Sequence, residues 1–217
     1  MTVRLIIAID GPAGSGKTTV ARELARELGL RHIDTGAMYR AFALAVSRLG
    51  ISEHEPAEFV PLLDKVDIRL SDGTMFLNAE DVSAEIRSST VDKVVSPVAA
   101  VPEVRRWMVE RQQHLAGDSG GVVEGRDIGT VVFPGADLKV FLTAESSERA
   151  RRRAAQNEQD EMHSALESIS HRDRLDMERQ ASPLKAATDA VVIDSTHKTA
   201  EQIVAAILQL LQERGLL

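Results

Sequence analysis

The chain has 217 residues, 43% of them hydrophobic and 27% charged, which is ordinary for a soluble globular protein. Its formal net charge of −7 argues against broad, non-specific binding to nucleic acid or to an anionic membrane surface. The absence of cysteine excludes disulfides, thiolate metal sites and cysteine nucleophiles. No apolar stretch approaches the roughly 18 residues that span a bilayer, and no secretory signal opens the chain, so we expect a cytoplasmic location.

The first apolar run, Leu5–Ile9, predicts a buried strand, and a glycine-rich loop follows it directly. From Gly11 to Thr18 the loop reads GPAGSGKT, which fits the phosphate-binding pattern G-x-x-x-x-G-K-[ST]. Glycines let backbone N–H groups turn inward toward phosphate oxygens, Lys17 can reach the β- and γ-phosphates, and the Thr18 hydroxyl can sit on Mg²⁺. A plain glycine-rich turn is the alternative, but the strand before and the helix after are the context the motif requires. The residues expected to bind ATP are Gly11, Pro12, Ala13, Gly14, Ser15, Gly16, Lys17, Thr18 and Thr19.

The rest of the chain alternates between apolar runs and helical patterns. Apolar residues recur at helical spacing in Thr18–Leu28, which Gly29 should end, and again in Ala200–Leu211. This alternation predicts an α/β fold with a parallel sheet flanked by helices. The five predicted strands are Leu5–Ile9, His32–Ile33, Val122–Val123, Leu138–Leu142 and Ala190–Ile193.

Two stretches interrupt the alternation. Residues 66–70 alternate in polarity, a turn-rich segment follows, and residues 75–77 are apolar again, which predicts a hairpin within an inserted subdomain at about 36–100. The polar stretch at about 151–164 is either an exposed connection between helices or a mobile lid. We therefore expect one domain over 1–217, with its core at about 1–35, 101–150 and 165–217.

Ligands in open α/β sheets bind beyond the carboxyl ends of the strands. The segment Asp34–Arg40 follows the second strand; Asp34 or Thr35 could simply cap a helix there, or Tyr39 and Arg40 could meet a second ligand. The segment Glu124–Thr130 follows the third strand, and its Arg-Asp pair is either a salt bridge or a ligand contact. Its two flanking glycines favour close approach of a ligand.

Two groups of charged residues share a helical face each. Arg149, Arg152 and Arg153 could form a solvated face or clamp a transferring phosphoryl group. Arg172, Asp176 and Arg179 could form an intrahelical ion-pair ladder or bind an anion and sugar hydroxyls. The residues alone leave both choices open, and Ser96 and Arg105 carry only weak local signals.

Seven motifs in this order resemble the bacterial cytidylate kinase family of nucleoside monophosphate kinases, and not adenylate kinases. The match runs nearly end to end. The motifs are GPAGSGKTT (11–19), DTGAMYR (34–40), DVSAEIR (81–87), EGRDIGTVVFPGA (124–136), ERARRR (148–153), RDRLDMER (172–179) and DAVVIDST (189–196).

The resemblance implies a P-loop kinase domain with a P-loop core, an NMP-binding insert and a short arginine-rich lid. It implies transfer of the γ-phosphoryl group of Mg-ATP to CMP and dCMP, in pyrimidine nucleotide metabolism. It gives catalytic roles to Lys17, Arg126 and Arg152, and a magnesium contact to Thr18. The residues that it implies for CMP are Ser96, Arg105 and Asp127 facing the base with the Thr35 hydroxyl nearby, Arg40 and Arg126 at the phosphate, Arg172 and Asp176 at the sugar, and Arg179 at the phosphate or base. Tyr39 is a further candidate for contact with CMP.

The chemistry of the acceptor is consistent with these roles. A carboxylate only accepts hydrogen bonds, so Asp127 would favour the exocyclic amine of cytosine over the carbonyl of uracil. The acceptor phosphate oxygen is already anionic, so no general base is required. A kinase for UMP or another monophosphate is the closest alternative. A nucleotide-dependent switch is the other, although the guanine-reading N-K-x-D motif is absent. We expect a monomer with no stable nucleic-acid partner and no membrane association.

Overall fold

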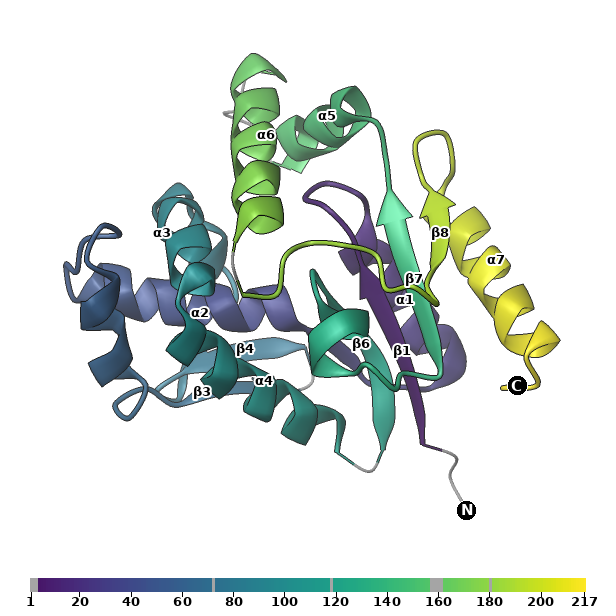
Figure 1. Cartoon of the computed structure of the whole chain (residues 1–217), viewed down its shortest axis with the longest axis horizontal. Helices are drawn as coiled ribbons and strands as arrows, with labels where there is room; N and C mark the ends of the chain where they lie inside the picture. Colours follow the sequence, from purple (N-terminus) through teal and green to yellow (C-terminus); the bar gives the residue numbers. More distant parts are fainter. Residues whose placement is uncertain (1–3, 72, 118, 157–161, 180) are drawn as a thin grey trace. The chain divides into compact units, whose positions relative to one another are not determined.

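The chain forms a five-stranded parallel sheet, as the alternating pattern predicts, and four of its strands lie wholly within the first of two compact units (Figure 1). The computed structural model describes residues 4–71, 73–117, 119–156, 162–179 and 181–217. The first unit comprises Met1–His32 and Ala116–Leu217, and the second comprises Ile33–Leu115. The strands of the large sheet, in the order β2-β6-β1-β7-β8, are β2 (His32–Asp34), β6 (Gly120–Gly125), β1 (Leu5–Asp10), β7 (Leu138–Thr143) and β8 (Val191–Asp194).

The central strand of this sheet leads into the glycine-rich loop. β1 pairs in parallel with β6 on one side and with β7 on the other, and β7 pairs in parallel with β8. All residues of β1 and β6 are buried, as expected for strands covered on both faces. The carboxyl ends of β1 and β6 lie in register, with Asp10 opposite Gly125 and Ile9 opposite Glu124. The segments after these strands therefore begin at the same edge of the sheet.

Helices α1 (Lys17–Leu28) and α7 (Ala200–Glu213) share one apolar cluster with the sheet. α1 contributes Val20 and Leu24, and α7 contributes Ile203 and Ile207, at the spacing that places them on one face of each helix. α7 begins with a capping box in which Thr199 and Gln202 satisfy each other's backbone N–H groups. Both helices thus start and end within a few residues of the predicted limits.

Two further helices of the first unit follow β7. α5 (Ser146–Gln156) and α6 (Met162–Glu178) pack against each other around Ala150 and Ile169, with Ala13 of the glycine-rich loop beside them. The centre of the stretch predicted as a lid, residues 157–161, lies outside the described residues. None of the helices in the described part of the chain combines the length and apolar character that crossing a bilayer requires.

The second unit contains the predicted hairpin. β3 (Ile68–Ser71) and β4 (Thr74–Leu77) pair antiparallel, and the short strand β5 (Glu80–Asp81) adds to β4. The helices of this unit are α2 (Thr35–Arg48), η1 (Pro56–Leu62), η2 (Glu85–Arg87), α3 (Ser89–Ala100) and α4 (Pro102–Ala116). Its core has Phe42 of α2 and Phe59 of η1 among its fully buried side chains. The insert predicted at about 36–100 falls within this unit.

Candidate functional site

The loop from Gly11 to Thr18 joins β1 to α1 with a backbone path that its glycines make possible. Gly11 has φ 152°, and a Cβ atom there would lie 2.1 Å from the carbonyl oxygen of Leu142 in β7. Gly14 has φ 75°, and a Cβ atom there would lie 2.9 Å from the carbonyl oxygen of Arg149. Within the described residues no side chain caps the start of α1. Its first N–H groups and the positive end of the helix dipole are therefore suited to an anion.

Lys17 lies inside this loop. Its ammonium group donates to the carbonyl oxygen of Pro12 at 2.7 Å and to the hydroxyl of Ser15 at 3.3 Å. Burial lowers the pKa of Lys17, and the positive charges of Arg126 and Arg172 lower it further. A buried cation among other cations gains most from an anionic ligand, so this environment favours the binding of phosphate.

Thr18 is hydrogen-bonded to a buried carboxylate that the sequence analysis did not name as a site residue. The Thr18 hydroxyl donates to Oε2 of Glu124 at 2.9 Å, and Oε1 of Glu124 lies 2.8 Å from Nε2 of His32. Glu124 is 3% exposed. The signal that could have identified it is an acidic residue at the end of the strand next to the glycine-rich loop. A hydroxyl and a carboxylate are oxygen donors of the kind Mg²⁺ binds, so Thr18 and Glu124 fit that ion.

The described residues contain no group of three or more histidine, cysteine, aspartate or glutamate side chains that could hold a metal. Mg²⁺ typically keeps several waters and binds through one or two carboxylates together with substrate phosphates. A magnesium ion at Thr18 and Glu124 would therefore depend on a bound nucleotide for the rest of its ligands.

Asp10, the last residue of β1, supports the loop that carries Asp127. Its two carboxylate oxygens accept hydrogen bonds of 2.8 Å from the backbone N–H groups of Ile128 and Gly129. These residues begin a wide turn, Ile128–Val132, closed by bonds between residues five apart, a rare geometry that is frequent at functional sites. Burial raises the pKa of Asp10 to about 6, and the negative charge of Asp127 contributes to the increase.

A chain of alternating charges joins the segment after β6 to α6. Nε of Arg126 donates to Asp176 at 2.9 Å, Arg179 lies 3.5 Å from Asp176, and Arg179 also lies 3.9 Å from Asp127. Burial by itself would raise the pKa of Asp176, but the charges of Arg126, Arg172 and Arg179 outweigh it and hold the pKa below its usual value. The structure thus brings together, in one unit, five residues that the resemblance assigns to the acceptor: Arg126, Asp127, Arg172, Asp176 and Arg179. Their three guanidinium groups exceed their two carboxylates, which leaves positive charge for a phosphate.

The predicted arginine face of α5 divides into different roles. Arg149 is buried, forms an ion pair with Asp173 of α6, and donates to the carbonyl oxygens of Ala13 and Ala144 at 3.0 Å each. Asp173 in turn accepts from the N–H of Ala13 at 3.2 Å. Arg149 therefore supports the glycine-rich loop through protein contacts, which a solvated helix face would not do.

Arg152 lies beside the loop without being buried. Its guanidinium donates to the carbonyl and hydroxyl oxygens of Ser195 at 2.6 and 3.0 Å and to Glu148 at 2.8 Å. A Cβ atom built on Gly16 would lie 3.6 Å from its Nη1 atom. This location is compatible with the catalytic role that the resemblance implies for Arg152 as part of a clamp on the transferring phosphoryl group, which stays a prediction.

The remaining predicted acceptor residues belong to the second unit. Arg40 donates to the carbonyl oxygen of Ile86 at 3.0 Å and pairs with Asp92 at 2.5 Å. The guanidinium of Arg105 lies 5.7 Å from the ring centroid of Tyr39. Thr35 is buried at the start of α2, Ser96 is half-buried on α3, and Asp34 accepts from the N–H of Ala37, so the helix-cap reading of Asp34 is correct. The predicted acceptor residues are thus shared between the two units.

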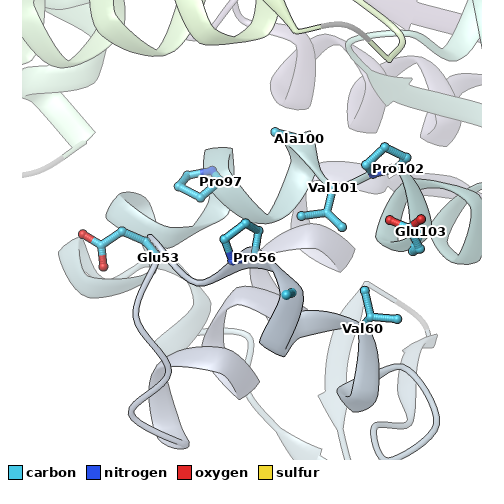
Figure 2. A pocket seen from close by; sticks show the side chains of 9 residues that line it. Glu53, Pro56, Val60, Pro97, Ala100, Val101, Pro102 and Glu103 are labelled. Atoms are coloured by element: carbon cyan, nitrogen blue, oxygen red, sulfur yellow. The ribbon is translucent and has the colours of Figure 1, made fainter.

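The second unit also has an apolar hollow of about 460 Å³, shown in Figure 2. Its lining contains no arginine or lysine, so it lacks the charge needed for a phosphate. None of the predicted site residues lines it. The lining residues are Glu53, Pro56, Ala57, Val60, Pro97, Ala100, Val101, Pro102 and Glu103.

Comparison with known proteins agrees with the resemblance seen in the motifs. A family model described as cytidylate kinase matches residues 7–213. A cytidylate kinase of Mycobacterium leprae (strain Br4923) is 45% identical over 97% of each chain, and one of Geobacillus thermodenitrificans (strain NG80-2) is 44% identical over 99% of each. The solved structure of shikimate kinase from Acinetobacter baumannii in complex with shikimate shares the fold, with a TM-score of 0.50 and 15% identity over 98% of this chain and 95% of that one. The family match and the near full-length identity show that this chain belongs to the cytidylate kinase family.

Proposed function

We propose that this enzyme transfers the γ-phosphoryl group of Mg-ATP to the phosphate of CMP and dCMP, giving CDP and dCDP. The observation that carries the proposal is the pairing, within one unit, of the Lys17 loop with the Arg126–Asp176–Arg179 charge chain, in a chain 45% identical to a cytidylate kinase. The Lys17 loop suits a triphosphate, and the Arg126–Asp176–Arg179 charge chain suits a second anionic ligand. We place the reaction in cytoplasmic pyrimidine nucleotide metabolism, carried out by a monomer.

On the donor side, the backbone N–H groups of Gly11–Thr19 would hold the ATP phosphates. Lys17 would leave the Pro12 carbonyl for the β- and γ-phosphates, and Arg152 would approach from α5. Thr18 and Glu124 would hold Mg²⁺, which when bound neutralises part of the charge on the triphosphate.

On the acceptor side, Arg40 and Arg126 would hold the CMP phosphate, and Arg172 and Asp176 would bind the sugar. Asp127, with Ser96 and Arg105, would recognise cytosine, and Thr35, Tyr39 and Arg179 would complete the pocket. The acceptor oxygen is an anion, so the enzyme needs no base to activate it. The main obstacle is repulsion between two polyanions, which the lysine and the arginines would offset while stabilising charge on the transferring group.

The experiment is a measurement of ADP release from Mg-ATP with CMP, dCMP, UMP, AMP and dTMP as acceptors. We expect CMP and dCMP to stimulate release far more than the other three. Stimulation by UMP alone would identify a kinase for another monophosphate. Nucleotide binding without acceptor-dependent ADP release would identify a binding module, and either result would reject the proposal.

A further inference from the structure

His32 lies in a hydrogen-bonded series with two residues of the donor side, and neither the sequence motifs nor the proposed mechanism uses it. Its Nε2 atom is 2.8 Å from Oε1 of Glu124, while Oε2 of the same carboxylate accepts from the Thr18 hydroxyl at 2.9 Å. The side chain of Glu124 is 4% exposed and that of His32 is 20% exposed. Each oxygen of the Glu124 carboxylate is thus held by a different side chain.

The chemistry of the three groups fixes the direction of both hydrogen bonds. An ionised carboxylate has only acceptors, so Nε2 of His32 carries the proton that it shares with Glu124. The Thr18 hydroxyl has one proton and donates it to Glu124. Its oxygen lone pairs are consequently left for a cation.

The strand register accounts for the position of His32. The N–H of Val122 in β6 donates to the carbonyl oxygen of Arg31 at 2.8 Å, which aligns the start of β2 with β6. His32 then lies beside the strand end that carries Glu124. Without a donor at position 32, one oxygen of a nearly buried carboxylate would lose this partner, and rotation of the carboxylate would release Thr18.

We propose that His32 is a positioning residue: by holding Glu124, it orients the Thr18 hydroxyl and sets the magnesium concentration at which this protein binds ATP. Residues that hydrogen-bond to metal ligands commonly change metal affinity about 10- to 100-fold when they are replaced. The inference rests on the proposed function, since it assumes a magnesium-dependent nucleotide at this loop.

The test measures the binding of ATP by calorimetry across a series of Mg²⁺ concentrations, without CMP and without turnover. His32→Phe keeps a ring but removes the donor, and His32→Gln keeps a donor. The Mg²⁺ midpoint is the Mg²⁺ concentration at which the gain in ATP affinity is half complete. We expect His32→Phe to raise this midpoint about 10-fold and to leave ATP affinity in EDTA unchanged. The Mg²⁺ midpoint of His32→Gln should lie within about threefold of the wild-type value. His197→Ala, which changes an exposed histidine, should have the wild-type midpoint.

Two outcomes would overturn the inference. One is a His32→Phe variant whose Mg²⁺ midpoint equals that of the wild type. The other is an equal shift of the Mg²⁺ midpoint in the Phe and Gln variants, which would indicate a structural role only. If His32→Phe does not fold, His32→Ala is the donor-free variant to compare with Gln.

A double-mutant cycle tests the route through Glu124. In a Glu124→Gln background, replacing His32 by Phe should cause little further shift, because the carboxylate that it holds is gone. An undiminished shift would mean that His32 acts by another route and would reject the proposal. Failure of the proposed function itself would appear separately, as a wild-type protein that binds Mg-ATP but does not phosphorylate CMP.

Discussion

The ammonium of Lys17 binds the carbonyl oxygen of Pro12, 2.7 Å away, within the same phosphate-binding loop. In the proposed function, a bound triphosphate would replace this contact. The cationic group is buried and lies close to two arginines, so its exchange of a carbonyl for a phosphate is favourable.

Lys17→Met should therefore reduce phosphoryl transfer by at least about 100-fold while the fold is retained, because a similar volume remains but the charge is lost. The measurement is kcat with saturating CMP, together with the circular dichroism spectrum and the melting temperature. Lys65→Ala removes an exposed lysine of the second unit and should have no effect on kcat. Substantial turnover by a folded Lys17→Met protein would contradict the role given to this loop.

Asp127→Asn should weaken the preference for CMP over UMP. An amide offers both a donor and an acceptor, so it can serve the amine of cytosine or the carbonyl of uracil, whereas a carboxylate serves only the amine. We expect the ratio of kcat/KM values for the two substrates to fall at least about 10-fold. Asp64→Asn, an exposed position, is the control. An unchanged ratio would remove Asp127 from base recognition.

The buried carboxyl of Asp10 makes stability depend on pH. Its pKa in the folded protein, about 6, lies above the ordinary 3.8, so the folded protein binds this proton more tightly than the unfolded chain does. The resulting stability is present below pH 4 and is lost as the pH rises through 6. A difference of about two between the pKa values of Asp10 in the folded and unfolded protein corresponds to roughly 3 kcal/mol of unfolding free energy.

Asp10→Asn removes this titration. The free energy of unfolding of the wild type, minus that of the variant, should fall by up to roughly 3 kcal/mol between pH 4 and pH 7. Urea titrations at several pH values measure this difference. A difference that stays constant with pH would show that Asp10 does not hold its proton in the folded state.

Asp173→Asn should destabilise the first unit. It leaves the buried guanidinium of Arg149 without its counter-charge and weakens the bond to the N–H of Ala13. Removing one partner of a buried ion pair typically costs about 3–5 kcal/mol. Urea unfolding gives the loss of stability, and ATP binding should weaken too because the loop loses support. Arg151→Ala, which breaks an exposed pair with Glu148, should leave both properties unchanged. A loss below about 1 kcal/mol for Asp173→Asn would show that the pair is dispensable.

Much of the fold follows from local patterns. The run Leu5–Ile9 predicts β1 because a strand covered on both faces needs apolar residues throughout, and the observed strand extends it only to Asp10. The spacing of Val20 and Leu24 similarly predicts α1. The short runs were harder to delimit: Val122–Val123 is the middle of the longer strand β6, whose outer residues include three glycines and a glutamate.

The site was less accessible from the sequence because its contacts join distant segments. Glu124 meets Thr18 only through the parallel register of β1 and β6, and no local pattern near Glu124 specifies that register. Arg149 and Arg152 look equivalent on a helical face. In the structure Arg149 is enclosed between α5, α6 and the glycine-rich loop, whereas Arg152 lies beside that loop without being buried. Their difference depends on how α5 packs against α6, which periodicity alone does not describe.

Gly11 has a consequence for how the family motif is read. A methyl group there would collide with the carbonyl of Leu142, so the first glycine of the motif lets the chain leave β1 close against the end of its neighbour β7 whether or not a nucleotide is bound. A descendant of this protein that had lost all kinase activity would still be expected to retain that glycine. In a distant relative, a preserved first glycine is therefore evidence of shared architecture, and the lysine is the position to inspect for evidence of surviving catalysis.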